Sequence, residues 1–163
     1  MESIFLGLGG NVGDRRGFMR RAVEALSEDR IRVLSRSSLY ASEPEGSDDQ
    51  EPYLNAAVEA QTPLAPLELL RHVKDIERRL GRVVRGRWAE REIDLDILLY
   101  GARTVEEKDL TIPHPRLHER RFALMPLAEI APEIRHPVIQ KTIAELLRDC
   151  TDEKRVVRLD VEW

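Results

Sequence analysis

The sequence of 163 residues lacks features that several protein classes need. Its single cysteine, Cys150, excludes an intramolecular disulfide and a multi-thiolate metal site, and it suits a reducing compartment. No hydrophobic run approaches the roughly 18 residues of a membrane-spanning helix, and no basic segment followed by an apolar one opens the chain. Aromatic residues make up 5% of the chain, and its net charge is −4. We therefore expect a cytoplasmic protein that binds neither a membrane nor nucleic acid.

Two common phosphate-binding motifs are also missing. The glycine-rich segment 7–13 fails the G-x-G-x-x-G spacing because Val12 occupies the last glycine position. The P-loop pattern G-x-x-x-x-G-K-[ST] does not occur. A bound phosphate would therefore be held by side chains and a metal ion.

Hydrophobic periodicity predicts one α+β domain spanning residues 1–163. Strands are expected at residues 3–9, 31–41, 54–60 and 93–100, and helices after Asp14 and over residues 66–80. This order is typical of a ferredoxin-like βαββαβ sandwich, with two helices on one face of an antiparallel sheet. Beyond Gly101 we expect C-terminal elaborations, with helical stretches ending at Leu127 and Leu147 and a last strand at 156–161. Polar, broken segments at 42–52 and 81–91 are predicted to be loops.

The strongest chemical signal is the pair Asp94 and Asp96 in the strand 93–100. The two-residue period of a strand places both carboxylates on one face, with Cα atoms about 7 Å apart. Adjacent acids repel each other unless a cation lies between them, and their oxygens suit Mg²⁺. Two solvated acids on an exposed strand face remain the alternative.

Arginines precede this pair and favour the metal interpretation. Guanidinium groups of Arg82, Arg85, Arg87 and Arg91 can hold phosphate oxygens while a metal bridges others, as in phosphoryl transfer. Trp88, between the arginines, could close over a bound ring. A solvated arginine-rich loop is the alternative.

Two further sites are weaker. Tyr53 and Asn55 share one strand face, which suits a flat heterocycle with amide-like edges, although both could simply complete a turn. Among the histidines, His114 lies between Pro113 and Pro115 and is the functional candidate, with a structural turn as the alternative. His72 is expected at the surface.

Together these motifs resemble the 6-hydroxymethyl-7,8-dihydropterin pyrophosphokinase family of folate biosynthesis. The matching motifs are LGGNVGD at 8–14, SEPEG at 42–46 with YLN at 53–55, RW at 87–88 with IDLDIL at 93–98, and PHP at 113–115 with Arg120 and Phe122. The resemblance spans nearly the whole chain.

This resemblance implies transfer of pyrophosphate from ATP to the hydroxymethyl group of the reduced pterin, with release of AMP. It implies two Mg²⁺ ions on Asp94 and Asp96, and catalytic roles for these acids together with Arg82 and Arg91. Nucleotide contacts are implied for Glu77, Arg82, Trp88, Arg91, Thr111, His114 and Arg120. Pterin contacts are implied for Ser42, Tyr53, Asn55, Trp88 and Phe122. A monomer is expected.

The chain departs from the family in a few places. The usual Arg-Trp-Gly-Pro-Arg is here Arg87-Trp88-Ala89-Glu90-Arg91, and Lys74 stands where glutamine is common. Two other functions fit a ferredoxin-like sandwich, an RNA-binding module and a small-molecule regulatory domain. The scarcity of aromatics and the negative charge argue against the first, and the second leaves the two acids unexplained.

Overall fold

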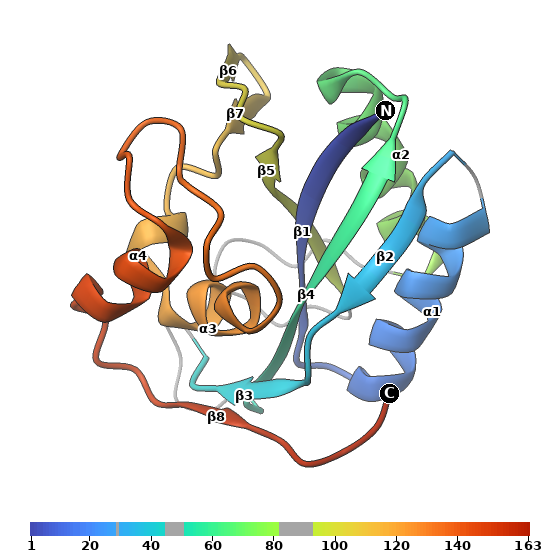
Figure 1. Ribbon diagram of the computed structural model, residues 1–163. Coiled ribbons are helices and arrows are strands. Elements are labelled where there is room, and N and C mark those ends of the chain that lie inside the picture. The colour runs from blue at the N-terminus through green and yellow to red at the C-terminus, as the bar shows by residue number, and fades with distance from the viewer. Residues whose placement is uncertain (29, 45–50, 82–92) are drawn as a thin grey trace.

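The computed structural model describes residues 1–28, 30–44, 51–81 and 93–163. A six-stranded antiparallel sheet forms its centre (Figure 1). Its long strands are β1 (Glu2–Gly10), β4 (Tyr53–Thr62) and β5 (Asp94–Tyr100). Two short strands, β3 (Tyr40–Ser42) and β8 (Val156–Arg158), complete the order β5-β1-β4-β3-β8, and β2 (Arg32–Arg36) also pairs with β4. Each residue of β1 therefore has a neighbour on both sides along most of the strand.

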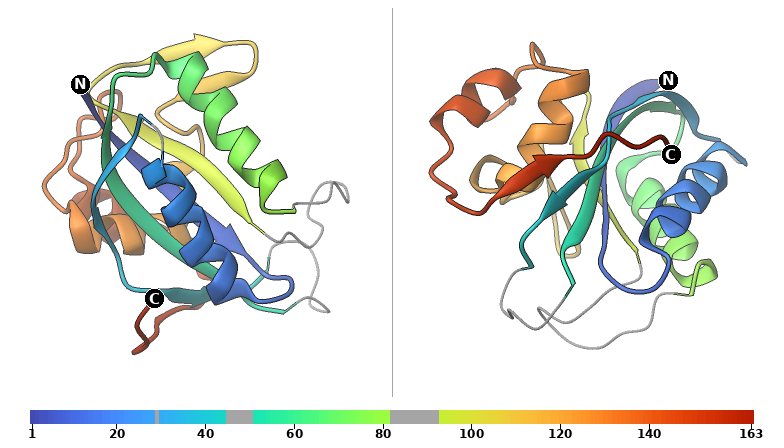
Figure 2. Two further views of the ribbon diagram at one scale, coloured as in Figure 1. Left: turned by 90° about the vertical axis from the view of Figure 1, so that its right-hand side faces the viewer. Right: turned by 90° about the horizontal axis from the view of Figure 1, so that it is seen from below.

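Helices cover both faces of the sheet (Figure 2). Helices α1 (Arg15–Glu28) and α2 (Pro66–Arg79) pack on one face, and α3 (Arg121–Ile130) and α4 (Ile143–Asp149) lie on the other. Two groups of buried hydrophobic residues correspond to these two layers. The order β1-α1-β2-β3-β4-α2-β5, in which β2 and β3 together take the place of one strand, confirms the predicted ferredoxin-like α+β fold.

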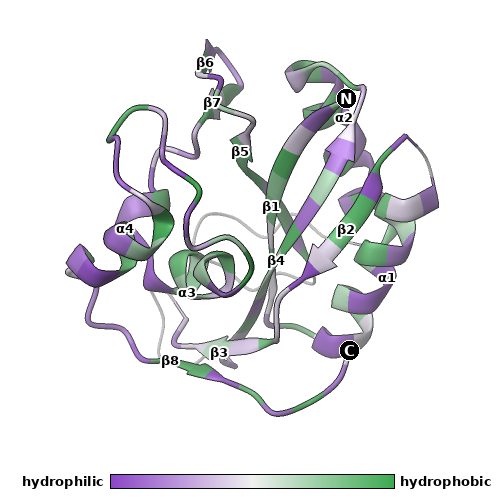
Figure 3. Cartoon of the chain, in the orientation of Figure 1, coloured by the Kyte–Doolittle hydropathy of each residue, from purple (hydrophilic) through white to green (hydrophobic). Residues whose placement is uncertain are grey.

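Local signals explain the first two helices. Asp14 accepts a hydrogen bond from the main-chain N–H of Gly17 (3.1 Å), so it caps α1 as predicted. Pro66 begins α2 and Glu68 lies in its first turn, where a negative charge complements the helix dipole. Gly81 follows α2 with a φ of +90°, which glycine adopts without strain. Hydrophilic and hydrophobic bands alternate along α1 (Figure 3).

The strand predicted at residues 31–41 is wrong in one respect, because it is two strands. β2 ends at Arg36, and a short strand β3 (Tyr40–Ser42) follows. Between them the Ser37 hydroxyl accepts the hydrogen bond of the Ala57 N–H (2.9 Å), and the Ser38 N–H turns to Glu129 (3.0 Å to Oε2). The Ser37 N–H still donates to the Ala57 carbonyl (2.9 Å), so these side-chain hydrogen bonds supplement the main-chain pairing between the two strands. Ser42, predicted as the start of a loop, is the last residue of β3.

The C-terminal third contains the predicted helices and elements that the sequence did not reveal. A hairpin of β6 (Val105–Glu107) and β7 (Leu110–Ile112) follows β5, and a short 3-10 helix, η1 (Leu117–Glu119), precedes α3. The last strand, β8 (Val156–Arg158), is shorter than the predicted 156–161 and pairs with β3.

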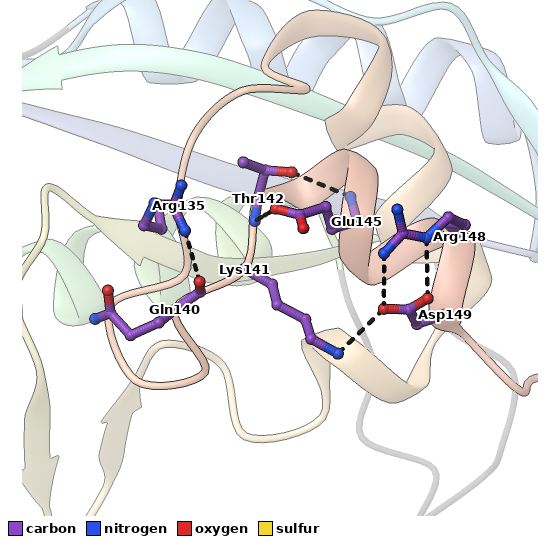
Figure 4. A network of polar contacts seen from close by, with 7 residues as sticks. All are labelled: Arg135, Gln140, Lys141, Thr142, Glu145, Arg148 and Asp149. Carbon is purple, nitrogen blue, oxygen red and sulfur yellow. Dashed lines mark hydrogen bonds and ion pairs between the residues drawn. The ribbon is translucent and has the colours of Figure 1, made fainter.

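Helix α4 is held by a polar network (Figure 4). Thr142 and Glu145 form a capping box, in which the Thr142 hydroxyl accepts from the Glu145 N–H and the Glu145 carboxylate accepts from the Thr142 N–H. Asp149 accepts hydrogen bonds from Lys141 and Arg148 near the other end. Among the residues that the structure describes, every helix is too short or too polar to cross a bilayer.

Candidate functional site

A cavity of about 250 Å³ lies between the sheet and the start of α3. Its lining includes eight residues that the sequence analysis singled out: Ser42, Tyr53, Asn55, Asp94, Asp96, His114, Arg120 and Phe122. The other lining residues are Gly7, Leu8, Gly9, Glu43, Ala56, Leu98, Leu117 and Ala123. Candidate metal, nucleotide and pterin residues therefore meet in one space.

The strand register explains how they meet. Gly9 of β1 pairs with Asp94 on one side and with Asn55 on the other. Strands lie about 4.8 Å apart, so Asp94 and Asn55 are separated by about 10 Å at the level of the main chain. Gly7 likewise separates Asp96 from Ala57. Because directly paired residues share a face, the acids and the amide point to the same side of the sheet.

Gly7 and Gly9, which we call the glycine floor, leave this space free of side chains. A Cβ at Gly9 would lie 3.3 Å from the Asn55 Oδ1 atom, and one at Gly7 would lie 3.4 Å from the Leu98 side chain. A side chain at Gly9 would push against Asn55, and one at Gly7 would come into contact with Leu98, so either would narrow the cavity.

Asp94 and Asp96 are both partly buried, whereas Leu95 and Ile97 between and after them are buried on the opposite face. The predicted alternation is therefore confirmed, and the two carboxylates are on the cavity wall. The main-chain N–H of Leu95 donates to the carboxylate of Glu77 (2.6 Å), whose side chain is 2% exposed. Glu77 of α2 thereby fixes the main chain between the two acids.

The other side of the cavity carries an amide and two aromatic rings. The Asn55 side-chain NH₂ donates to the Ser42 hydroxyl (2.6 Å), and both residues are 4% exposed. This hydrogen bond orients the amide, so its oxygen faces the glycine floor. Tyr53 and Phe122 are partly buried lining residues that come from β4 and α3.

His114 is a neutral imidazole on the cavity wall at pH 7. Burial, followed by the positive charges of Arg120 and Arg116, lowers the pKa of His114 to about 4. Its Nδ1 atom accepts a hydrogen bond from the Arg116 N–H (3.1 Å), which leaves the proton on Nε2. The neutral ring can therefore donate one hydrogen bond. The guanidinium of Arg120 lies over the Phe122 ring at 5.5 Å.

Some predicted site residues lie elsewhere. Thr111 is exposed on β7, and the carboxylate of Glu77 lies beneath β5, outside the cavity lining. Lys74 forms an ion pair with Glu77 (3.3 Å). The predicted residues Arg82, Trp88 and Arg91 lie outside the described residues, together with Ala89, Glu90 and most of the two predicted loops.

Sequence reasoning missed two components of the cavity. The glycine floor could have been found, because Gly7 and Gly9 share strand parity and alternate with the apolar Leu6 and Leu8. Glu43 could not, since its carboxylate accepts from the Arg155 N–H (3.1 Å), a residue far along the chain.

The remaining histidines add no chemistry to this cavity. His136 is buried, and its Nδ1 accepts the N–H groups of Val138 and Ile139, so it closes a turn. His72, expected at the surface, is partly buried, with a buried Nε2 atom.

Comparisons with known proteins show which family the chain resembles. Residues 5–132 match the sequence profile of the family 7,8-dihydro-6-hydroxymethylpterin-pyrophosphokinase (HPPK). The chain is 41% identical over 145 residues to the 2-amino-4-hydroxy-6-hydroxymethyldihydropteridine pyrophosphokinase of Aquifex aeolicus, covering 89% of this chain and 90% of that protein. It is 39% identical to the enzyme of the same name from Haemophilus influenzae, covering 96% and 98%.

The fold also resembles solved structures. A crystal structure of Plasmodium falciparum HPPK-DHPS superimposes with a TM-score of 0.71 at 18% sequence identity. The match covers 91% of this chain and 43% of that longer chain. This structural likeness concerns the fold alone.

Proposed function

The chain belongs to the 7,8-dihydro-6-hydroxymethylpterin-pyrophosphokinase family, and we propose which part of its cavity binds each of the two substrates. The enzyme transfers pyrophosphate from ATP to the hydroxymethyl group of 6-hydroxymethyl-7,8-dihydropterin, giving the pterin diphosphate and AMP in folate biosynthesis. The nucleotide phosphates lie on the β5 side, and the pterin lies on the β4 side of the glycine floor.

The pterin side is supported by geometry. A reduced pterin is a flat heterocycle whose edge carries amide-like donors and acceptors, and stacking aromatic rings with a fixed amide match it. Tyr53 and Phe122 supply the rings, and Asn55, oriented by Ser42, supplies the amide. Trp88 stays a prediction for this side.

The acid side fits Mg²⁺ in its donor set. Two carboxylates at alternate positions of a strand offer hard oxygen ligands on one face. Among the described residues, no three His, Cys, Asp or Glu side chains cluster together. We propose that Asp94 and Asp96 hold two Mg²⁺ ions, which supply neutralising charge to the triphosphate when bound.

The protein's own groups perform the positioning. The separation of about 10 Å between the Asp94 and Asn55 main chains leaves the hydroxymethyl oxygen and the β-phosphorus to meet above Gly9. Arg120 adds positive charge beside the transferred group, and neutral His114 donates a hydrogen bond without adding charge. Arg82, Arg91, Glu77 and Thr111 retain the nucleotide roles that the resemblance implies.

We also propose that the enzyme acts as a cytoplasmic monomer without a nucleic-acid partner. The sheet face that RNA-binding relatives of this fold use as a platform is covered here by α3 and α4. Light scattering during size-exclusion chromatography tests the monomer, and a mass twice 18.8 kDa would contradict it.

The observation that carries this assignment is the glycine floor with acids on one side and the oriented amide with two rings on the other. Calorimetry on variants should therefore distinguish the pterin side of the cavity from the nucleotide side. We expect Tyr53→Ala and Phe122→Ala to weaken pterin binding at least tenfold, measured with Mg²⁺ and a non-hydrolysable ATP analogue present. Binding of that analogue should change less than twofold.

The matched control is Phe18→Ala, which removes a ring of α1 that packs against the core and does not line the cavity. It should leave the affinity for both ligands unchanged. Equal losses of pterin and nucleotide affinity in Tyr53→Ala would contradict the division of the cavity.

A further inference from the structure

The segment from Cys150 to Arg158 follows α4 and runs past the start of α3 to the edge of the sheet, where β8 lies beside β3 (Figures 1 and 2). We call residues 150–158 the C-terminal brace. It lies beyond residue 132, where the match to the family profile ends. The brace does not line the cavity, but it contacts both of its pterin-side walls.

The first contact is with Arg121, the first residue of α3, which directly precedes the cavity residue Phe122. The Arg121 main-chain N–H donates to the Asp152 carboxylate (3.0 Å). Its guanidinium donates through Nε to the Asp152 carbonyl (3.0 Å) and through one terminal nitrogen to the Cys150 carbonyl (3.0 Å). Three hydrogen bonds therefore join the brace to the turn of α3 that carries Phe122.

The charge at this helix start supports a specific role for the pair. The first turn of α3 contains no acidic residue, and a positive arginine there opposes the helix dipole. Asp152 supplies the missing negative charge from another part of the chain and also satisfies a free N–H of the first turn. The start of α3 is thus stabilised by the brace instead of by its own sequence.

The second contact is with β3 and the residue after it. Ser42, which orients Asn55, pairs with Val156 of β8. The next residue, Glu43, lines the cavity and accepts from the Arg155 N–H (3.1 Å). The wall carrying Ser42 and the wall carrying Phe122 are therefore both attached to one short segment.

We propose that the C-terminal brace, acting through Arg121, is a positioning element that sets the spacing between Phe122 and the Ser42–Asn55 wall. The proposal rests on the pterin site described above. A stacking site depends on spacing to within about 0.5 Å, because rings that stand too far apart lose contact with the bound heterocycle. Arg121 is a positioning residue, since it touches the brace and not the cavity.

Steady-state kinetics on purified variants test the proposal. In Arg121→Gln we expect the KM for the pterin to rise about fivefold to tenfold, while the KM for ATP and kcat stay within twofold. Arg121→Lys can donate to one of the two carbonyls and should recover part of the loss. Asp152→Asn keeps an acceptor for the Arg121 N–H but removes the charge, and we expect a smaller rise of about twofold to threefold.

Arg148→Gln is the matched control, because Arg148 is an exposed arginine of neighbouring α4 that pairs with the adjacent Asp149. It should leave every kinetic constant unchanged. Thermal unfolding of each variant shows whether it is folded at the assay temperature. A folded Arg121→Gln with an unchanged pterin KM, or with equal rises for both substrates, overturns the proposal.

Failure of the brace can be told apart from failure of the pterin site itself. If Tyr53→Ala and Phe122→Ala weaken pterin binding but Arg121→Gln does not, the brace has no positioning role and the pterin site stands. If none of the three variants affects pterin binding, the pterin site is wrong and the brace proposal falls with it.

Discussion

We expect that Asp94 and Asp96 can be replaced with little effect on stability but with a large effect on turnover. Asp94 and Asp96 contribute no core packing, because Leu95 and Ile97 fill the opposite face of β5. We expect Asp94→Asn and Asp96→Asn each to lower turnover by about two orders of magnitude or more, since each removes the charge of a metal ligand in the proposed site. The midpoint of thermal unfolding should change by only a few degrees.

Coupled assays of AMP release at saturating substrate measure this effect. Glu106→Gln, an equivalent change in an exposed acid of β6, serves as the control. Near-normal turnover in either folded aspartate variant would remove that residue from the metal site.

His114 links the cavity to pH. Its pKa of about 4 in the folded protein lies below the value of about 6.5 for an unfolded histidine. Between these values the unfolded chain binds more protons, so the free energy of unfolding falls as the pH drops from 6.5 towards 4, and the contribution is complete above pH 6.5. We expect His114 to cost about 1–2 kcal/mol of stability between pH 7 and pH 5.

His114→Asn tests this pH dependence, because its amide oxygen can still accept from the Arg116 N–H but does not titrate. Urea unfolding at both pH values should show a smaller loss in this variant than in the wild type. The remaining loss includes His136, whose pKa burial also lowers. An identical pH dependence in both proteins would mean that His114 titrates normally.

For single residues, the two-residue period of a strand predicted which side chains share a face of the sheet, but it could not predict contacts between separate elements. It placed Asp94 with Asp96 and Tyr53 with Asn55, because a strand's side-chain direction follows from sequence alone. It could not reveal that Glu77 binds the Leu95 N–H or that Asp152 caps α3, because those contacts depend on how separate elements pack.

Helices were predictable where capping residues close in the sequence mark their ends. Thr142 and Glu145 begin α4 with a complete capping box (Figure 4). We expect Thr142→Ala to lower the free energy of unfolding by about 0.5–2 kcal/mol, the usual cost of losing such a cap. Catalytic constants should stay unchanged.

Denaturant unfolding measures the loss, with Thr151→Ala, an exposed threonine after α4, as the control. A loss equal to that of the control would show that the cap contributes nothing to stability.

The element that prediction mistook shows the limit of periodicity. Residues 31–39 keep an alternating burial pattern, yet the regular strand stops at Arg36 and resumes at Tyr40. The interruption depends on Glu129 of α3, which accepts from Ser38 and from the Tyr40 hydroxyl (2.7 Å). Burial and this hydrogen bond raise the pKa of Tyr40 to about 12, so the phenol stays a donor throughout the neutral range. A partner ninety residues away cannot be inferred from local pattern.

The whole molecule has two hydrophobic layers that share one sheet. Leu69 of α2 belongs to one layer and Leu127 of α3 to the other, and strands β1, β4 and β5 contribute residues to both. If the chain is one domain, Leu69→Ala and Leu127→Ala should each lower the stability of a single transition, by about 2–5 kcal/mol. Circular dichroism and tryptophan fluorescence should then give coincident unfolding curves.

Two separate transitions, with each variant shifting only one of them, would instead divide the chain into independent units. The overall fold was predictable from the order of elements, whereas the layer of α3 and α4 was not, because two helices after a complete βαββαβ unit can pack in several places.

The glycine floor has a consequence for inhibition and resistance. Side chains around a binding site can usually mutate to smaller ones and so release a drug while sparing the substrate. Gly7 and Gly9 have nothing left to remove, so every substitution adds atoms where Leu98 or Asn55 already stands close. An inhibitor that makes its main contacts with this stretch of main chain therefore meets a surface on which escape from the drug also obstructs the natural substrate.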